Sequence, residues 1–138
     1  MKNLNVVSLF SGAGELDIEF KRSGFNIIYA NEYDKTIWNT VEYNFQATPL
    51  DKRDIRNIIS QDIPDCIGII GGPSYQSWSW TGSLRGIEGP KGKLFFDYIR
   101  IIKNKKPLFF VAENVPGILH ERNIKAFNSI LDGFKARA

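Results

Sequence analysis

The sequence predicts an α/β fold in which parallel strands are covered by helices on both faces. Four short apolar runs carry this prediction, each long enough for one buried strand, at residues 5–10, 25–30, 67–70 and 108–112. Segments with the 3.6-residue period of an amphipathic helix lie between them. Apolar strands that alternate with helices are typical of a parallel sheet.

The first two helices are predicted from apolar spacing and from their end signals. After the first strand, Leu16, Ile18 and Phe20 indicate a helix, and Gly24 is a typical stop. After the second strand, Asp34 can cap a helix. The apolar face of that helix comprises Ile37, Trp38, Val41 and Phe45. An irregular stretch through Pro49 should lead into a short helix over residues 54–60.

The second half of the chain begins with an unusual connection. Residues 72–91 are rich in Gly, Ser, Arg and Lys and show no periodicity, and a connection of this length within a compact domain is usually functional or mobile. Apolar stripes then predict helices over residues 94–103 and 121–134, on either side of the last strand. His120 would be a solvent-facing residue at the start of the last helix.

Composition narrows the class of protein. The 138 residues suffice for one domain, and the 43% apolar and 24% charged shares are ordinary for a soluble globular protein. The net charge of +3 fits a polyanionic partner, although many domains without one carry such a charge. Cys66 is the single cysteine, which excludes an internal disulfide and a cysteine-based metal site. Without a membrane-length apolar run or a signal-peptide pattern, we expect a cytoplasmic protein.

A glycine-containing turn between the first strand and helix is the first candidate site. It reads Phe-Ser-Gly-Ala-Gly at residues 10–14, and glycines there let a ligand approach the backbone. Asp17 stands where the dinucleotide fingerprint requires a third glycine, which disfavours a nicotinamide dehydrogenase. Glu32, at the end of the second strand, suits a ribose diol, and Tyr33 offers a flat face for a purine. The alternative is a simple turn.

A second segment carries a family resemblance. Residues 71–79 read Gly-Gly-Pro-Ser-Tyr-Gln-Ser-Trp-Ser, at the end of the third predicted strand. This segment resembles the catalytic loop of DNA (cytosine-5) methyltransferases, which runs Gly-Gly-Pro-Pro-Cys-Gln-Ser-Trp-Ser in some bacterial members. Further matches follow in family order at residues 10–14, Glu32, Asp54, residues 94–96 and the Glu-Asn-Val of residues 113–115.

The resemblance implies a Rossmann-like S-adenosylmethionine-dependent methyltransferase fold, of which residues 1–138 would be the amino-terminal part of the catalytic domain. The target-recognition domain would be absent. It also implies S-adenosylmethionine as cofactor, double-stranded DNA as partner and a restriction–modification system as context. By resemblance and by the residue chemistry above, the cofactor-binding residues would be Phe10, Ser11, Gly12, Ala13, Gly14, Glu32, Tyr33, Asp54, Ile55, Ser74 and Leu94.

The resemblance also assigns residues to catalysis and to DNA. Glu113 and Asn114 would bind the target base, and Glu113 should be partly desolvated because it leaves an apolar strand. The DNA contacts would be Gln76, Ser77, Ser79, Arg85 and Lys91, with Lys93 as a further phosphate contact. Plainer interpretations stay open: Asp54 could be a helix cap, Glu113 a loop cap, and the basic, glycine-rich segment of residues 82–93 a solvated loop.

Tyr75 occupies the position of the family nucleophile, and Ser74 that of its preceding proline. A thiolate adds readily to carbon 6 of cytosine, whereas a phenol, with an ordinary pKa of about 10, is a weaker and bulkier nucleophile. Cys66 lies at the opposite end of the intervening strand and suits a small buried apolar position.

Three interpretations follow from this substitution. The chain is a fragment or variant of a methyltransferase, inactive alone; or a non-catalytic remnant that binds cofactor or DNA; or one subunit of a split enzyme. In the truncated sheet, an exposed apolar edge would favour a complementing chain or a homodimer.

Overall fold

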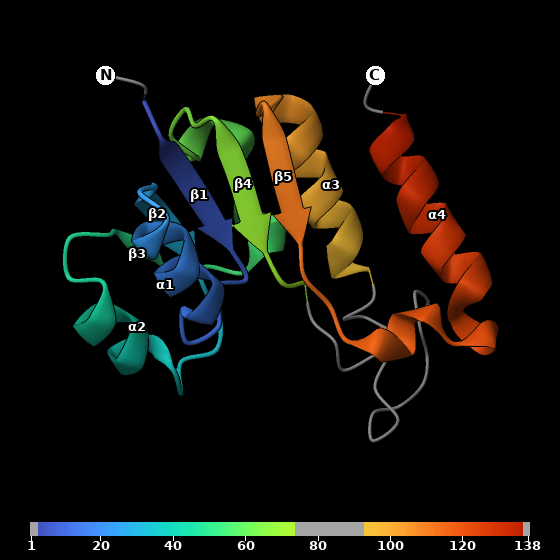
Figure 1. Ribbon diagram of the computed structural model, residues 1–138, viewed down its shortest axis with the longest axis horizontal. Coiled ribbons are helices and arrows are strands. Elements are labelled where there is room, and N and C mark those ends of the chain that lie inside the picture. Colours follow the sequence, from blue (N-terminus) through green and yellow to red (C-terminus); the bar gives the residue numbers. More distant parts are fainter. Residues whose placement is uncertain (1–2, 74–92, 137–138) are drawn as a thin grey trace.

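The computed structural model describes residues 3–73 and 93–136, and it confirms the α/β prediction. Five strands form one sheet in the order β3-β2-β1-β4-β5, and every pairing is parallel (Figure 1). The strands are β1 Asn5–Leu9, β2 Asn26–Asn31, β3 Leu50–Asp51, β4 Gly68–Gly71 and β5 Phe109–Ala112. Because the order reverses between β1 and β4, this is the doubly wound arrangement whose ligands bind beyond the carboxyl ends of the strands.

Four α-helices and several single turns connect the strands. The α-helices are α1 Glu15–Arg22, α2 Trp38–Asn44, α3 Leu94–Lys105 and α4 Ile124–Lys135. The 3-10 turns are η1 Ile55–Asn57, η2 Ser60–Asp62, η4 Pro116–Leu119 and η5 Glu121–Asn123. None of the helices in the described ranges is long and apolar enough to cross a membrane.

The two faces of the sheet bury different clusters. On one face, Val6, Ile27 and Ile70 pack against α1. On the other face, Val7, Leu9 and Ile69 form the main core with α3 and the 3-10 turns. Successive strand residues point to opposite faces, so the uninterrupted apolar run of β1 supplies both layers. The apolar strand pattern therefore predicted a sheet covered on both sides, as observed.

Helix α4 lies beside α3 rather than over β1 and β2 (Figure 1). Phe95 and Ile99 of α3 pack with Ile130 of α4 and Ile118 of η4 in a separate buried cluster. The ring of Phe134 stacks on Phe110 of β5 with centroids 4.6 Å apart. Helix α4 thus extends the core past the end of the sheet.

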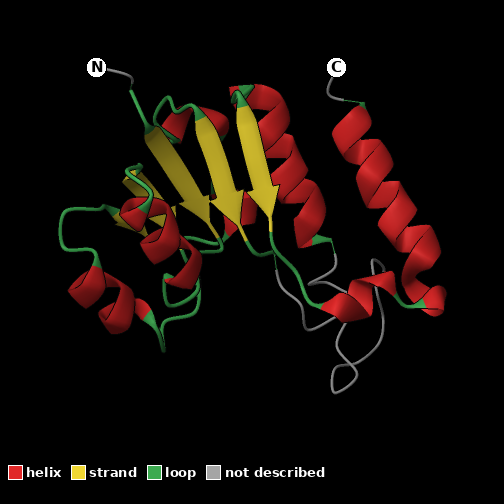
Figure 2. Cartoon of the chain, viewed as in Figure 1, coloured by secondary structure: helices red, strands yellow, loops and turns green. Residues whose placement is uncertain are grey.

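The carboxyl ends of all five strands are aligned in one lateral row. The parallel register pairs Asp51 with Asn31, Asn31 with Leu9, Leu9 with Gly71, and Gly71 with Ala112. Figure 2 shows the arrowheads of β1, β4 and β5 at this common edge. The residue that follows each member of the row begins a loop, and Phe10, Glu32, Gly72 and Glu113 are four of these residues.

Several local predictions were wrong. Residues 54–60 do not form one helix, because Ile58 and Ile59 adopt extended backbone angles between η1 and η2, which lets Ile58 enter the core. Helix α2 begins at Trp38, and Asp34 instead accepts a hydrogen bond from the Thr36 amide, 2.9 Å away, in the preceding turn.

Two further elements differ from expectation. The last helix begins at Ile124, after a separate 3-10 turn. Strand β3 was missed because its two residues carry no periodic signal, and its existence depends on pairing with β2.

Candidate functional site

The loop from β1 to α1 turns sharply through left-handed backbone conformations. Phe10 has φ 53°, Gly12 φ 57° and Gly14 φ 92°. A Cβ atom at Gly14 would lie 2.3 Å from the Phe45 ring, so a side chain there would displace Phe45. A Cβ atom at Gly12 would meet nothing within 4 Å. The Gly12 backbone is therefore open to a ligand, whereas Gly14 is required for packing.

Glu32 joins this loop to the end of β2. One carboxylate oxygen accepts a hydrogen bond from the Gly12 amide at 2.9 Å, and the other accepts one from the Asp34 amide at 2.8 Å. Each oxygen retains a second lone pair, which leaves two acceptor positions for vicinal hydroxyls. The adjacent Tyr33 side chain is 66% exposed. This arrangement can hold a diol and a flat ring at the edge of the sheet.

The end of β3 leads to Asp54, which does cap a turn, as the plainer interpretation proposed. Its carboxylate accepts a hydrogen bond from the Arg56 amide at 2.9 Å and pairs with the Arg56 guanidinium at 2.6 Å. The hydrogen bond from the Arg56 side chain lowers the pKa of Asp54, so the group is an ionised acceptor. Ile55 is 2% exposed and belongs to the main core, against which Leu94, the first residue of α3, also packs.

Residues that follow β4 and β5 meet at the same edge. The Glu113 amide donates to the Gly71 carbonyl at 2.8 Å, and a Cβ atom at Gly72 would lie 2.9 Å from a Glu113 carboxylate oxygen. Asn114 donates through Nδ2 to the Pro73 carbonyl at 2.7 Å, and its Oδ1 accepts from the Val115 amide at 2.9 Å. Asn114 therefore holds the chain as it leaves β4.

Glu113 is exposed, so the expected partial desolvation of its carboxyl group was wrong. It lies one residue beyond the last pair of the β4–β5 ladder, where the apolar layers that bury the strands have ended. Lys93, which was expected to be a further phosphate contact, is also exposed.

Seven predicted site residues lie outside the described ranges: Ser74, Tyr75, Gln76, Ser77, Ser79, Arg85 and Lys91. Cys66 precedes β4 and therefore lies at the opposite edge from Gly71. It is partly buried against the main core, and burial raises the pKa of its thiol. Both facts agree with the apolar interpretation of Cys66.

A buried carboxyl group behind the glycine loop was not predicted as a site. Asp17, on the first turn of α1, is 1% exposed, and Ser8 of β1 donates a hydrogen bond to its Oδ1 at 2.6 Å. Among the residues that the structure describes, its Oδ2 has no hydrogen-bond partner. Burial raises the pKa of Asp17 from 3.8 to about 6, opposed by the Ser8 hydrogen bond. The available signal was a serine within an apolar strand followed by an acidic residue in the helix that covers it.

Asn31 is a second buried polar residue that sequence reasoning missed. It ends β2 and is 2% exposed, and its Nδ2 donates to the carbonyls of Asp51 and Arg53, both at 2.9 Å. These bonds join the end of β2 to the end of the edge strand β3 and to the segment that carries Asp54. An asparagine that ends an apolar strand could have been noticed, but its partners are distant in the sequence.

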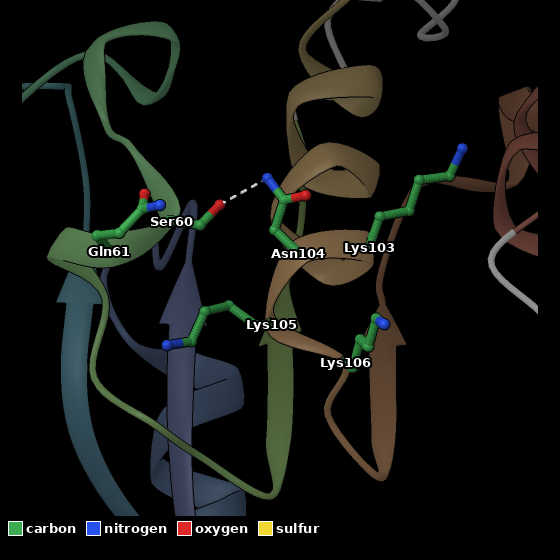
Figure 3. A pocket seen from close by; sticks show the side chains of 6 residues that line it. All are labelled: Ser60, Gln61, Lys103, Asn104, Lys105 and Lys106. Carbon is green, nitrogen blue, oxygen red and sulfur yellow. Dashed lines mark hydrogen bonds between the residues drawn. The ribbon is translucent and has the colours of Figure 1, made fainter.

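Features elsewhere in the described residues do not add to this site. A shallow hollow of about 450 Å³ is lined by Ser60, Gln61 and residues 103–106 (Figure 3). It lies at the end of α3 that precedes β5, which is the opposite edge of the sheet. His120 accepts a weak hydrogen bond from the Arg122 amide at 3.4 Å, at the start of η5. Within the described ranges, no three metal-ligating side chains gather.

Known proteins similar to this chain share one description. The family model described as C-5 cytosine-specific DNA methylase matches residues 4–137. Two similar curated proteins are the type II methyltransferases M.FnuDI of Fusobacterium nucleatum, 58% identical, and M.NgoPII of Neisseria gonorrhoeae, 54% identical. They align over 96% and 95% of this chain but over only 38% and 39% of their own lengths. The chain therefore spans well under half of these relatives.

Solved structures agree on the fold. A crystal structure of an E. coli protein, described as a prophage-encoded DNA modification methyltransferase, superimposes with a TM-score of 0.81 at 30% identity. That match covers 96% of this chain and 38% of the other. A Spodoptera frugiperda DNMT2 mutant gives a TM-score of 0.70 at 23% identity, over 94% of this chain and 41% of that one, which supports the fold alone.

Proposed function

Because the chain belongs to the C-5 cytosine-specific DNA methylase family, we propose that it binds S-adenosylmethionine at the carboxyl edge of its sheet. Within a complete methyltransferase, it would contribute to methyl transfer to carbon 5 of a cytosine in double-stranded DNA. The cofactor, when bound, supplies an activated methyl group on a sulfonium. Residues 1–138 would form the amino-terminal part of the catalytic domain, and target recognition would belong to another part of the protein.

The carboxylate of Glu32 is the observation that carries this proposal. It is fixed by the Gly12 and Asp34 amides and retains acceptor positions for two ribose hydroxyls. The exposed face of Tyr33 and the ionised Asp54 suit an adenine ring and its amino group. The open Gly12 backbone admits the rest of the molecule. The residues therefore fit an adenosyl ligand. Ile55, being buried, would offer that ligand little surface.

We also propose that this chain alone does not form the covalent adduct with cytosine. Tyr75 stands where the family loop has its cysteine, and a phenol is poorly ionised near neutral pH. Cys66 cannot replace it, since it lies at the other edge of the sheet with a raised pKa. Glu113 and Asn114 would still present acceptor and donor groups to a base. A cofactor-binding remnant and one subunit of a split enzyme both fit these observations.

Calorimetric titration with S-adenosylmethionine tests the cofactor site. We expect the parent chain to bind and Glu32→Ala to bind at least about tenfold more weakly, because two charge-assisted hydrogen bonds are lost. Glu42→Ala is the matched control, since the Glu42 carboxylate, on α2, pairs with Lys52 at 2.7 Å outside the proposed site. Equal affinity in the parent and Glu32→Ala would contradict the assignment of Glu32, and no binding by the parent would contradict the site in this chain.

A further inference from the structure

The segment that carries Asp54 has little regular structure to hold it. Strand β3 ends at Asp51 and β4 begins at Gly68, and only single 3-10 turns lie between them. Two backbone hydrogen bonds close η1 internally, from the Asn57 and Ile58 amides. Ile55 and Ile58 bury their side chains in the main core. Apolar burial is non-directional, so it sets the depth of the segment but not the rotation of its backbone.

Arg100 of α3 supplies directional contacts to this segment. Its Nη1 donates to the Ile58 carbonyl at 3.0 Å, and its Nη2 donates to the Ile55 carbonyl at 2.9 Å. Asp97, one turn earlier on α3, accepts from the same guanidinium at 3.3 Å. The planar fork of an arginine can serve two carbonyls and a carboxylate together, which the ammonium of a lysine cannot do with the same geometry.

The carbonyls that Arg100 binds lie just after the proposed adenine-binding residue, Asp54, in the chain. Ile55 directly follows Asp54, whose carboxylate caps the same turn. On the other side, Asn31 holds the Asp51 and Arg53 carbonyls. The backbone at Asp54 is therefore held between a strand end and helix α3. Displacing η1 would rotate the Asp54 carboxylate away from any ligand bound at Glu32.

We infer that Arg100 is a positioning residue for the adenine end of the cofactor site, acting through the Ile55 and Ile58 carbonyls on the orientation of Asp54. The inference rests on the proposed cofactor function. It assigns Arg100 no contact with the ligand. Because Arg100 belongs to α3, recognition of the adenine base, rather than of the ribose, would depend on this helix.

The test compares two ligands in variants of residue 100. The ligands are S-adenosylhomocysteine and its inosine counterpart, in which a carbonyl oxygen replaces the adenine amino group that Asp54 would bind. Arg100→Met keeps the apolar stem without the guanidinium, and Arg100→Lys retains a donor. Arg22→Met is the control, because Arg22 pairs with Glu19 on the exposed face of α1. Affinities are measured by calorimetry well below the unfolding temperature.

We expect Arg100→Met to bind the adenosine ligand about tenfold more weakly, with Arg100→Lys in between. The preference for adenine over hypoxanthine should fall in the same order, while Arg22→Met matches the parent. A lower unfolding temperature with an unchanged preference would show a merely structural role and overturn the inference. If Arg100→Met does not fold, Arg100→Lys carries the same comparison.

Failure of the proposed cofactor site can be told apart from failure of the role proposed for Arg100. If the parent binds neither ligand, the proposed cofactor site has failed in this chain. Amide hydrogen exchange then tests Arg100 by itself. Faster exchange at Asn57 and Ile58 in Arg100→Met, with unchanged exchange in β1, would sustain the action of Arg100 on the η1 backbone, independently of the cofactor. Unchanged exchange at both amides would overturn it.

Discussion

At the scale of single residues, Asp17 shows how burial changes a side chain that looks ordinary in the sequence. The loop in front of it carries the proposed cofactor contacts, and Ser8 satisfies only one of its carboxylate oxygens. Desolvation disfavours the ionised form, so the pKa rises from 3.8 to about 6. The folded state therefore binds a proton that the unfolded chain has released throughout this interval.

This linkage predicts a pH-dependent stability. The Asp17 carboxyl group does not penalise folding below pH 3.8, where it is protonated in both states, and it destabilises the fold increasingly as the pH rises to about 6. The full effect is about 3 kcal/mol. Asp17→Asn lacks this contribution, so the free energy of unfolding of this variant relative to that of the parent should rise by most of that amount between pH 4 and pH 7.

Chemical denaturation at several pH values measures this difference. Glu15→Gln on the same helical turn controls for the loss of one negative charge, because Glu15 is exposed. The comparison uses the change with pH rather than the absolute stability, since the asparagine amide introduces a buried donor of its own. A pH-independent difference between Asp17→Asn and the parent would contradict the raised pKa of Asp17.

At the scale of elements, the close approach of β1 and β4 depends on Gly71. A Cβ atom at Gly71 would lie 2.0 Å from the Leu9 carbonyl oxygen, a backbone atom that cannot move without disturbing the ladder. Gly12 provides a matched comparison, since its Cβ would meet nothing and only its φ of 57° disfavours a side chain.

We expect Gly12→Ala to lower the free energy of unfolding by about 1 kcal/mol, the cost of a left-handed conformation. Gly71→Ala should lower it by about 3 kcal/mol, because overpacking against the backbone separates β1 from β4 at the proposed site. Urea denaturation of the two variants measures both values. Equal losses in the two variants would show that β1 and β4 tolerate a wider separation than the structure indicates.

At the scale of the whole molecule, β5 is the last strand of the sheet, and among the described strands it pairs with β4 alone. Leu108, immediately before it, is 85% exposed, and Val111 within it is 37% exposed. An unpaired strand edge with apolar side chains is a template for pairing with another chain. We therefore expect the chain to self-associate through β5.

Sedimentation velocity at increasing protein concentration tests this expectation. The apparent mass should rise with concentration, and Val111→Lys should restore the monomer because a charge on the edge opposes strand pairing. Leu119→Lys is the control, since Leu119 is 59% exposed in η4 and lies outside the sheet. A monomer at every concentration, or an equal effect of both variants, would refute self-association through β5.

The sequence by itself determined the α/β class, the order of the main elements and the family. Apolar runs such as residues 67–70, the glycine turn at residues 10–14 and the Glu-Asn-Val of residues 113–115 are contiguous, so their signals can be read locally. It also identified Glu32 at the end of β2, which the structure joins to Gly12. Local periodicity did not define β3, the division of residues 54–60 or the first turn of α2.

Only the tertiary structure decided which polar groups are buried and what they bind. Ser8 meets Asp17, Asn31 meets the Asp51 carbonyl, and Arg100 meets the Ile55 carbonyl, which is 45 residues away along the chain. Such pairs follow from the register of the strands and from the helix that packs on each face. Hydrogen bonds depend on distance and angle, which residue types alone do not specify.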